Sequence, residues 1–260
     1  MTGKSRERIS VIVPTLDEEG SLERCLSSAR SDAEVELIVA DGGSSDGTVS
    51  MARRLGAHVV EGAQGRAGQL NAGAGKARGT IVLFLHADTE LPRGFGDEVR
   101  EILSDPSVGL GAFRHRYDSD GRWHRFISLT VNLRCRLLGL PYGDQAFFLR
   151  REVFTRLGGF AHLPVLEDLD LVRRARREGG FVMARSEVVT SSRRGRSQGE
   201  LRTTCANDVL LMGFLLHVPP RRLLGAYRRI AGASRSSRSP SESRVISLHL
   251  GDRAEARSSE

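Results

Sequence analysis

The sequence predicts an α/β fold with a doubly wound, mostly parallel sheet whose C-terminal part is mixed. Short apolar runs alternate with amphipathic segments over residues 9–103, which is typical of consecutive β-α-β units. Ile81–Leu85 is a run of apolar residues, which indicates a strand buried on both faces, as in parallel sheets. With 260 residues, the chain is long enough to bury a substantial core.

The N-terminal half reads as strands separated by helices. Apolar residues from Leu22 to Ala29 recur at the i, i+3, i+4, i+7 spacing of an amphipathic helix, and Ser21 is predicted as its N-cap. A second helix is expected after Thr48, and a Gly-rich third helix over Gly65–Gly73. The expected strands are residues 9–13, 35–40, 58–61 and 81–85.

The C-terminal half alternates less regularly. Gly109 and Gly111, within a strand predicted over residues 108–117, indicate close backbone approach to a neighbouring element. Residues 231–260 are expected to be a disordered tail, because Ser and Arg dominate and apolar residues are few. The other expected elements are helices 95–103, 122–138, 151–157, 167–178 and 207–230 (interrupted at Pro219-Pro220) and strands 146–149 and 181–190.

The charge of the chain favours an anionic partner. The formal net charge is +7, and of the 39 basic residues only Lys4 and Lys76 are lysines. Part of that bias reflects coding preference in a GC-rich genome; the remainder suits a phosphorylated substrate or a membrane surface. A nucleic-acid partner is not expected, because the basic residues are not interleaved with aromatic residues in a reader motif.

Cysteines and apolar runs bear on localisation. Cys25, Cys135 and Cys205 form neither a zinc pattern nor an even disulfide set, which fits a reducing cytoplasm. No signal peptide is recognised at the polar N-terminus, and no apolar run reaches the roughly 18 residues of a transmembrane helix. Val209–Val218 is the longest candidate. It suits either a buried helix or, with the arginines that follow it, peripheral contact with the inner face of an anionic membrane.

Candidate site residues lie where predicted strands end. His86 and Asp88 follow the strand 81–85, at the sheet edge where α/β proteins bind ligands, and could hold a divalent cation against a diphosphate. The alternative is that Asp88 only caps the turn before Leu91-Pro92. Asp41 ends the second strand and could accept a hydrogen bond from a nucleobase, or open an Asx-turn at Gly42-Gly43.

Acidic and basic groups at predicted helix starts complete the set. The acidic run in Thr15–Glu19 suits either helix capping or contacts to a nucleoside. Arg66 and the glycines up to Asn71 offer a positive charge and N–H groups to a phosphate, although no P-loop is present. Asp168, in the acidic run Glu167–Asp170, could act as a general base or simply complement the helix dipole.

Together these segments resemble the GT-A-fold glycosyltransferases of family 2. The nearest group is a small bacterial one, termed the radical-SAM/selenodomain-associated transferase 2 type, which carries a His-Ala-Asp-Thr run. The resemblance covers roughly residues 9–178, and its order and spacing make it specific. The matching segments are Val11–Glu19, Val39–Thr48, Gly65–Gly73, Phe84–Asp88, Gly143-Asp144-Gln145, Gly158-Gly159-Phe160 and Glu167-Asp168.

The resemblance implies an inverting transfer of a sugar from a UDP- or GDP-sugar to an acceptor hydroxyl, with Asp168 as catalytic base. Mn²⁺ or Mg²⁺ would neutralise the departing diphosphate. The acceptor is not identified, and a lipid-linked one is left open. The implied metal ligands are Asp88 and His86, and the implied donor-binding residues are Pro14, Thr15, Glu18, Asp41, Arg66 and Asn71.

Two positions depart from the family pattern. His86 stands where the family's metal motif has an acid. A neutral imidazole ligand suits Mn²⁺ better than Mg²⁺. The other two interpretations are that Asp88 alone binds the metal or that the chain has lost its activity. Arg193-Arg194-Gly195 lacks the aromatic residue that follows an arginine pair in relatives. His86 makes a non-catalytic nucleotide-sugar-binding protein an alternative. A sugar-phosphate nucleotidyltransferase of the same fold is the other alternative, although Pro14–Glu19 lacks the Gly-rich loop that usually follows the first strand in those enzymes.

The expected domain organisation follows from the resemblance. Residues 1–230 form one GT-A domain, with a nucleotide-binding part over about residues 9–90, an acceptor part over about 91–200 and C-terminal helices over 205–230. Residues 231–260 lie outside this domain as the tail.

Overall fold

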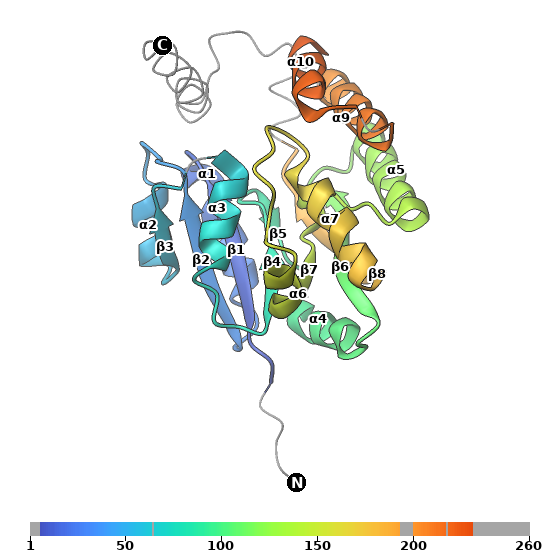
Figure 1. Cartoon of the computed structure of the whole chain (residues 1–260). Helices are drawn as coiled ribbons and strands as arrows, with labels where there is room; N and C mark the ends of the chain where they lie inside the picture. Colours follow the sequence, from blue (N-terminus) through green and yellow to red (C-terminus); the bar gives the residue numbers. More distant parts are fainter. Residues whose placement is uncertain (1–5, 64, 193–199, 217, 231–260) are drawn as a thin grey trace, which may run out of the picture.

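The computed structural model describes residues 6–63, 65–192, 200–216 and 218–230 (Figure 1). Its strands form one eight-stranded sheet in the order β3-β2-β1-β4-β7-β6-β8-β5. The strands are β1 (Ile9–Thr15), β2 (Val35–Asp41), β3 (His58–Glu61), β4 (Ile81–Phe84), β5 (Thr89–Glu90), β6 (Val108–Tyr117), β7 (Phe148–Arg150) and β8 (Gly180–Thr190).

Helices connect these strands and cover the sheet (Figure 1). Those of the first half are α1 (Glu19–Ala29), α2 (Thr48–Arg54), α3 (Gly65–Ala74) and α4 (Phe95–Ser104). Those of the second half are α5 (Arg122–Leu138), the 3₁₀ turn η1 (Gly143–Gln145), α6 (Arg151–Arg156), α7 (Glu167–Glu178), α9 (Glu200–Leu215) and α10 (Pro220–Ile230).

The pairing of the strands confirms the predicted fold class. β1 pairs in parallel with β2 and β4, and β2 with β3, so the N-terminal half is a parallel sheet. β7 is antiparallel to both of its neighbours, β4 and β6, and β5 is antiparallel to β8. The second half of the sheet is therefore mixed, as expected.

Two apolar cores lie on the two faces of the sheet. Along β1, Ile9, Val11 and Val13 face one core, together with buried residues of α1, α2 and α4. Ile12 faces the other core, together with buried residues of α3, α6 and α7. This alternation is the period of two of a strand buried on both sides, and it explains why the central strands read as continuous apolar runs.

The start of α1 corrects one prediction. The helix begins at Glu19, so Ser21 lies inside its first turn and is not the N-cap. The start of α2 and the loop before it satisfy these N–H groups instead: Glu18 N donates to Thr48 Oγ1 at 2.8 Å and Glu19 N to Asp46 Oδ2 at 3.2 Å. A tertiary contact thus replaces the local cap.

Other boundaries differ by a few residues. The sequence pattern did not predict β5, a strand of two residues, and α9 begins at Glu200 rather than at residue 207. The predicted tail 231–260 and the Arg193-Arg194-Gly195 segment lie outside the described residues. Among the described helices, none combines the length and the apolar character needed to cross a bilayer.

Candidate active site

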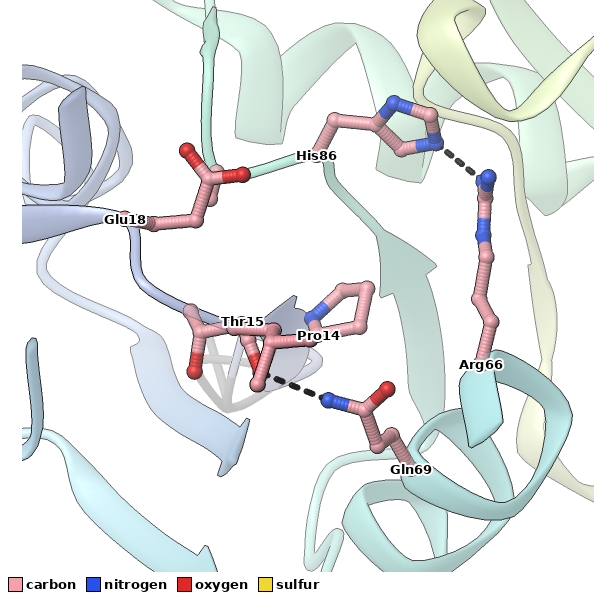
Figure 2. Close-up of a pocket in the computed structure, with 8 residues that line it drawn as sticks. Pro14, Thr15, Glu18, Arg66, Gln69 and His86 are labelled. Atoms are coloured by element: carbon pink, nitrogen blue, oxygen red, sulfur yellow. Dashed lines mark hydrogen bonds between the residues drawn. The ribbon is translucent and has the colours of Figure 1, made fainter. Parts of the chain in front are cut away.

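A polar cleft opens where β1 and β4 end. Its volume is about 260 Å³. Figure 2 shows two sides of the cleft. Pro14 and Thr15, at the end of β1, and Glu18, just after it, form one side, and Arg66 and His86 face each other on the other side. The lining residues are Pro14, Thr15, Leu16, Glu18, Arg66, Gln69, His86 and Ala87.

Asp41 shapes the loop beside this cleft. It is 1% exposed, and its carboxylate accepts hydrogen bonds from Thr15 Oγ1 at 3.0 Å and from the backbone N of Gly43 and of Ser44, both at 2.8 Å. The backbone bonds are those of the Asx-turn considered for this position. Asp41 therefore fixes Thr15 and the Gly42-Gly43 loop against each other.

Gln69 is a site residue that the sequence pattern did not reveal. It lies on α3, one turn after Arg66, and its side-chain Nε2 donates to the carbonyl oxygens of Thr15 at 2.7 Å and Ala40 at 2.9 Å. These bonds tie α3 to the carboxyl ends of β1 and β2. No motif marks Gln69, since a single glutamine on a helix carries no spacing signal.

Arg66 connects the two halves of the chain. Its Nε lies 3.3 Å from Glu167 Oε1, at the start of α7, and its guanidinium also contacts His86 Nε2 (Figure 2). Glu167 is 8% exposed, and burial raises the pKa of its carboxyl group while Arg66 opposes that shift. One cation thus faces a buried acid, a histidine and the cleft.

His86 is held in its neutral form. Burial first, then the charges of Arg66 and His115, lower the pKa of its imidazole well below the usual value. With the ring neutral, Nε2 can accept a hydrogen bond from Arg66, and the proton then resides on Nδ1. His86 also lines the cleft, and its Nε2 atom contacts the guanidinium of Arg66.

Asp168, on α7, lies near the place where Arg66 and His86 meet. Its Oδ2 accepts from Gly143 N at 3.0 Å, and its Oδ1 accepts from Leu169 N at 2.8 Å. A Cβ atom added at Gly143 would lie 2.6 Å from His86 Nε2 and 3.4 Å from Asp168 Oδ2, and it would also collide with the Arg66 guanidinium. Arg66, His86 and Asp168 therefore converge around Gly143, where a larger residue would displace at least one of these side chains.

The carboxyl groups of Asp88 and Asp144 influence each other electrostatically near this point. Burial first, and also the charge of Asp144, raise the pKa of the Asp88 carboxyl group. Asp144 belongs to η1; its Oδ2 lies 3.8 Å from His115 Nε2, and its buried Oδ1 receives no hydrogen bond from the described residues. Two neighbouring carboxylates suit a divalent cation, which one or two carboxylates hold together with substrate phosphates.

The described residues do not build a complete metal cage. Among them, no group of three or more His, Cys, Asp or Glu side chains is arranged to hold a metal ion by itself. The acidic pair fits a cation whose remaining ligands come from a bound phosphate and water. Asp144 was not among the predicted metal ligands, because Asp88 and Asp144 are far apart in the sequence.

Asn71 has a structural partner away from the cleft. Its side-chain Nδ2 donates to Phe160 O at 2.9 Å, and its Oδ1 accepts from Phe160 N at 2.8 Å. Asn71 is not among the residues that line the cleft. Its amide joins α3 to the loop that precedes α7.

The sheet order and a cleft at the carboxyl ends of β1 and β4 define a GT-A-type glycosyltransferase fold, and two solved structures share it. PcManGT, a mannosyltransferase from Pyrobaculum calidifontis solved with GDP-Man and Mn²⁺, has a TM-score of 0.65 and 22% identity, over 95% of this chain and 81% of that one. TarS 1–349 from S. aureus, solved with UDP-GlcNAc, has a TM-score of 0.57 and 17% identity; the match covers 78% of this chain and 66% of TarS 1–349.

Sequence comparison establishes the family. The model of glycosyl transferase family 2 matches residues 10–161, and the chain belongs to this family. A relative with 36% identity over 202 residues is the PGL/p-HBAD biosynthesis glycosyltransferase of Mycobacterium bovis, strain BCG / Pasteur 1173P2; the match covers 70% of this chain and 75% of the relative. The chain is thus a glycosyltransferase. This result favours the main prediction over the two alternatives, a non-catalytic nucleotide-sugar-binding protein and a nucleotidyltransferase.

Proposed function

We propose that this glycosyltransferase takes a sugar from a nucleoside diphosphate sugar and transfers it to an acceptor hydroxyl with inversion at the anomeric carbon. The observation that carries the proposal is the convergence of Arg66, His86 and Asp168 around Gly143, beside the cleft that begins at Pro14. The guanidinium of Arg66, which suits the leaving diphosphate, and the carboxylate of Asp168, which suits the acceptor proton, thereby lie within one site.

The cleft is proposed to receive the nucleoside diphosphate. Pro14 and Thr15, at the end of β1, and Glu18, just after it, line one side of the cleft. Asp41 holds Thr15 against the Gly42-Gly43 loop. Arg66 supplies a guanidinium that suits phosphate oxygens. The GDP-Man and UDP-GlcNAc named for the two similar structures support a UDP- or GDP-sugar as the donor.

Asp168 is proposed as the general base. The acceptor oxygen attacks the anomeric carbon from the face opposite the diphosphate, and the bond from that carbon to the diphosphate oxygen breaks. The hydroxyl proton passes to Asp168, and the electron pair of the broken bond leaves with the nucleoside diphosphate. The backbone N–H groups of Gly143 and Leu169 hold the two carboxylate oxygens and so fix the orientation of the base.

Asp88, with Asp144 beside it, is proposed to hold a divalent cation, Mn²⁺ or Mg²⁺. When bound, such an ion supplies positive charge that stabilises the leaving diphosphate. The mutual repulsion of the two carboxylates supports this role, because a cation would relieve it. His86 is proposed to position Arg66 rather than to coordinate the ion, since its Nε2 already contacts the guanidinium.

Asp168→Asn tests the base. Turnover with a UDP- or GDP-sugar should fall about 10²–10⁴-fold, because the amide cannot accept the acceptor proton. Donor affinity, measured by isothermal titration calorimetry with Mn²⁺, should stay within about twofold, since the base acts only in the transition state. Asp170→Asn is the matched control: Asp170 lies in the same helical turn but pairs with Arg173 and Arg174, and turnover should persist. Loss of donor binding in Asp168→Asn would contradict the assignment.

Asp88→Asn tests the cation. In a thermal-shift screen of UDP-, GDP- and dTDP-sugars, Mn²⁺ should raise the melting temperature of the donor-bound native protein further. The variant should lose that increment while folding normally, because the ligand charge is gone. Glu90→Gln removes an equal charge two residues away, from a carboxylate that pairs with Arg24, and should keep the increment. An undiminished Mn²⁺ effect in Asp88→Asn would exclude Asp88 as the ligand.

A further inference from the structure

Helix α5 exposes an apolar stripe. Phe126, Leu133 and Leu137 lie seven and four residues apart, so they share one face of the helix. The exposed fractions in this stripe are Trp123 38%, Phe126 54%, Leu129 66%, Leu133 53%, Leu137 71% and Leu138 41%. Burying large apolar side chains is favourable, so a row of them in water indicates a surface that another phase or molecule covers.

The stripe is not needed for packing within the described part of the chain. The opposite face of α5 packs onto β6 through His124, Ile127, Ser128 and Cys135, which are buried. Figure 1 shows α5 at the edge of the molecule opposite α2 and β3. The helix is therefore already anchored, and its outer face is free to act in binding.

Arginines flank the stripe, and no acid interrupts it. Arg122, Arg125 and Arg136 are exposed, and residues 122–138 contain neither Asp nor Glu. The fourth arginine of the helix, Arg134, instead stacks on the Tyr142 ring at 4.0 Å. Trp, Phe and Leu beside exposed arginines are the composition of a helix that lies in the headgroup region of an anionic bilayer.

We propose that α5 is the surface through which this enzyme docks on an anionic lipid bilayer. The apolar stripe enters the interface, and Arg122, Arg125 and Arg136 contact the lipid phosphates. A second copy of the chain suits this face less well, because symmetric pairing of α5 with itself would bring like-charged arginines together. The net charge of +7 favours the same anionic partner.

The position of α5 makes such docking relevant to the site. Arg176 of α7 donates to Leu138 O at the end of α5, and η1 follows a few residues later with the Gly143 N–H that holds Asp168. If Asp168 is the base, as proposed above, docking through α5 presents the acceptor side of the site to hydroxyls carried by the membrane. The docking itself can be measured without donor or acceptor, so its failure would leave the proposed reaction untouched.

The single tryptophan of the chain, Trp123, reports docking directly. The purified full-length chain is mixed with vesicles of phosphatidylglycerol and phosphatidylcholine, and separately with vesicles of phosphatidylcholine alone. Sedimentation with the anionic vesicles only, a blue shift of Trp123 emission and weakening of binding by salt are the expected results. Absence of sedimentation with anionic vesicles, or binding without change in Trp123 emission, would overturn the proposal.

Paired variants assign the surface. Leu129→Gln/Leu133→Gln/Leu137→Gln should lower vesicle affinity at least about tenfold while circular dichroism stays unchanged, because all three side chains are exposed. Met212→Gln/Leu216→Gln instead removes exposed apolar groups from α9 and from the residue that follows it, and should keep most of the binding. Loss of binding in the α9 variant alone would move the surface away from α5 and refute the assignment.

Charge and self-association complete the test. Arg122→Gln/Arg125→Gln should weaken binding about tenfold, since each arginine near the lipid surface contributes attraction. Arg53→Gln/Arg54→Gln makes the same charge change on exposed residues of α2 and should leave binding unchanged. Light scattering that found a dimer, dissociated by the α5 leucine substitutions, would identify a second copy as the occupant and overturn the lipid proposal.

Discussion

Single side chains hold distant segments of this enzyme together, and the pair Asp32–Arg100 is an example. Arg100 Nη1 and Nη2 donate to the two oxygens of Asp32 at 2.9 and 3.1 Å, joining the loop after α1 to α4. The side chains are only 7% and 11% exposed. The hydrogen bond from Arg100, more than any other influence, lowers the pKa of the Asp32 carboxyl group. A lowered pKa means that the native state favours the ionised acid.

This pair gives a prediction about acid stability. Because the native pKa lies below the unfolded one, the unfolded state binds more protons, and the stabilisation by Asp32 is lost as the pH falls through its native pKa. Asp32→Asn should therefore lower the free energy of unfolding by about 1–3 kcal/mol at neutral pH. The difference from the unmodified protein should shrink below about pH 4. Urea unfolding at both pH values measures this.

Asp120→Asn is the control for Asp32→Asn. Asp120 also pairs with an arginine, Arg125, but these side chains are 90% and 71% exposed, so its loss should not be measurable. An Asp32→Asn deficit that stayed constant down to acid pH would contradict the charge argument and leave packing as the cause.

At the scale of elements, β6 and α7 meet with almost no space between their backbones. A Cβ atom added at Gly109 would lie 2.6 Å from Ala175 O and 2.9 Å from Gly179 N. The obstacle is backbone rather than a flexible side chain, so it cannot move aside cheaply. This confirms the close backbone approach predicted at Gly109, whereas the neighbour of Gly111 is the side chain of Phe148. The approach at Gly109 sets the position of α7, which carries Asp168.

Gly109→Ala should therefore destabilise the protein by about 1–3 kcal/mol, because the added methyl group forces the strand and the helix apart. Urea unfolding followed by circular dichroism measures the loss. Gly225→Ala is the matched control: Gly225 lies in α10 with open space around its Cβ position. The control should be neutral or stabilising by up to about 1 kcal/mol, since alanine favours helix. Equal losses in both variants would refute the close-approach explanation.

At the scale of the whole molecule, Arg66 and Asn71 of α3 connect the first half of the chain to the second half. Arg66 reaches Glu167, and Asn71 makes both of its amide hydrogen bonds with the backbone of Phe160, in the loop before α7. We therefore propose that Asn71 acts on donor binding indirectly, by setting the distance between the cleft at β1 and Asp168, the proposed base on α7. The geometry of the site therefore depends on contacts between the two halves of the chain.

Asn71→Ala should lower the free energy of unfolding by about 1–3 kcal/mol, because it leaves both backbone groups of Phe160 without these partners. It should also weaken donor binding, measured by calorimetry, since Arg66 and Asp168 lose their fixed spacing. Asn132→Ala is the control: Asn132 makes the same two bonds to the backbone of His115, but within the second half. Asn132→Ala should lose a similar amount of stability and keep its donor affinity unchanged. Weakened donor binding in both variants would refute the role of Asn71 in spacing Arg66 and Asp168.

Apart from the two-residue strand β5 and the turn η1, the sequence alone determined the order of the elements, and it determined most candidate residues, because both are local properties. The periodicity of apolar residues follows from the geometry of strands and helices, so α5, β6 and α7 have the bounds that the pattern predicts. Arg66, His86 and Asp168 were found because each stands at the end of a strand or the start of a helix, where ligands bind.

Only the tertiary structure decided how these residues are used. The contact of Arg66 with His86, the electrostatic influence of Asp144 on Asp88 and the hydrogen bonds of Asn71 to Phe160 all join segments far apart in the chain. No local period encodes such contacts; they arise when sheet pairing and the two cores bring strand ends and helix starts to one edge. For the same reason, only the tertiary structure shows which face of α5 packs on β6 and that the apolar stripe on the other face is exposed.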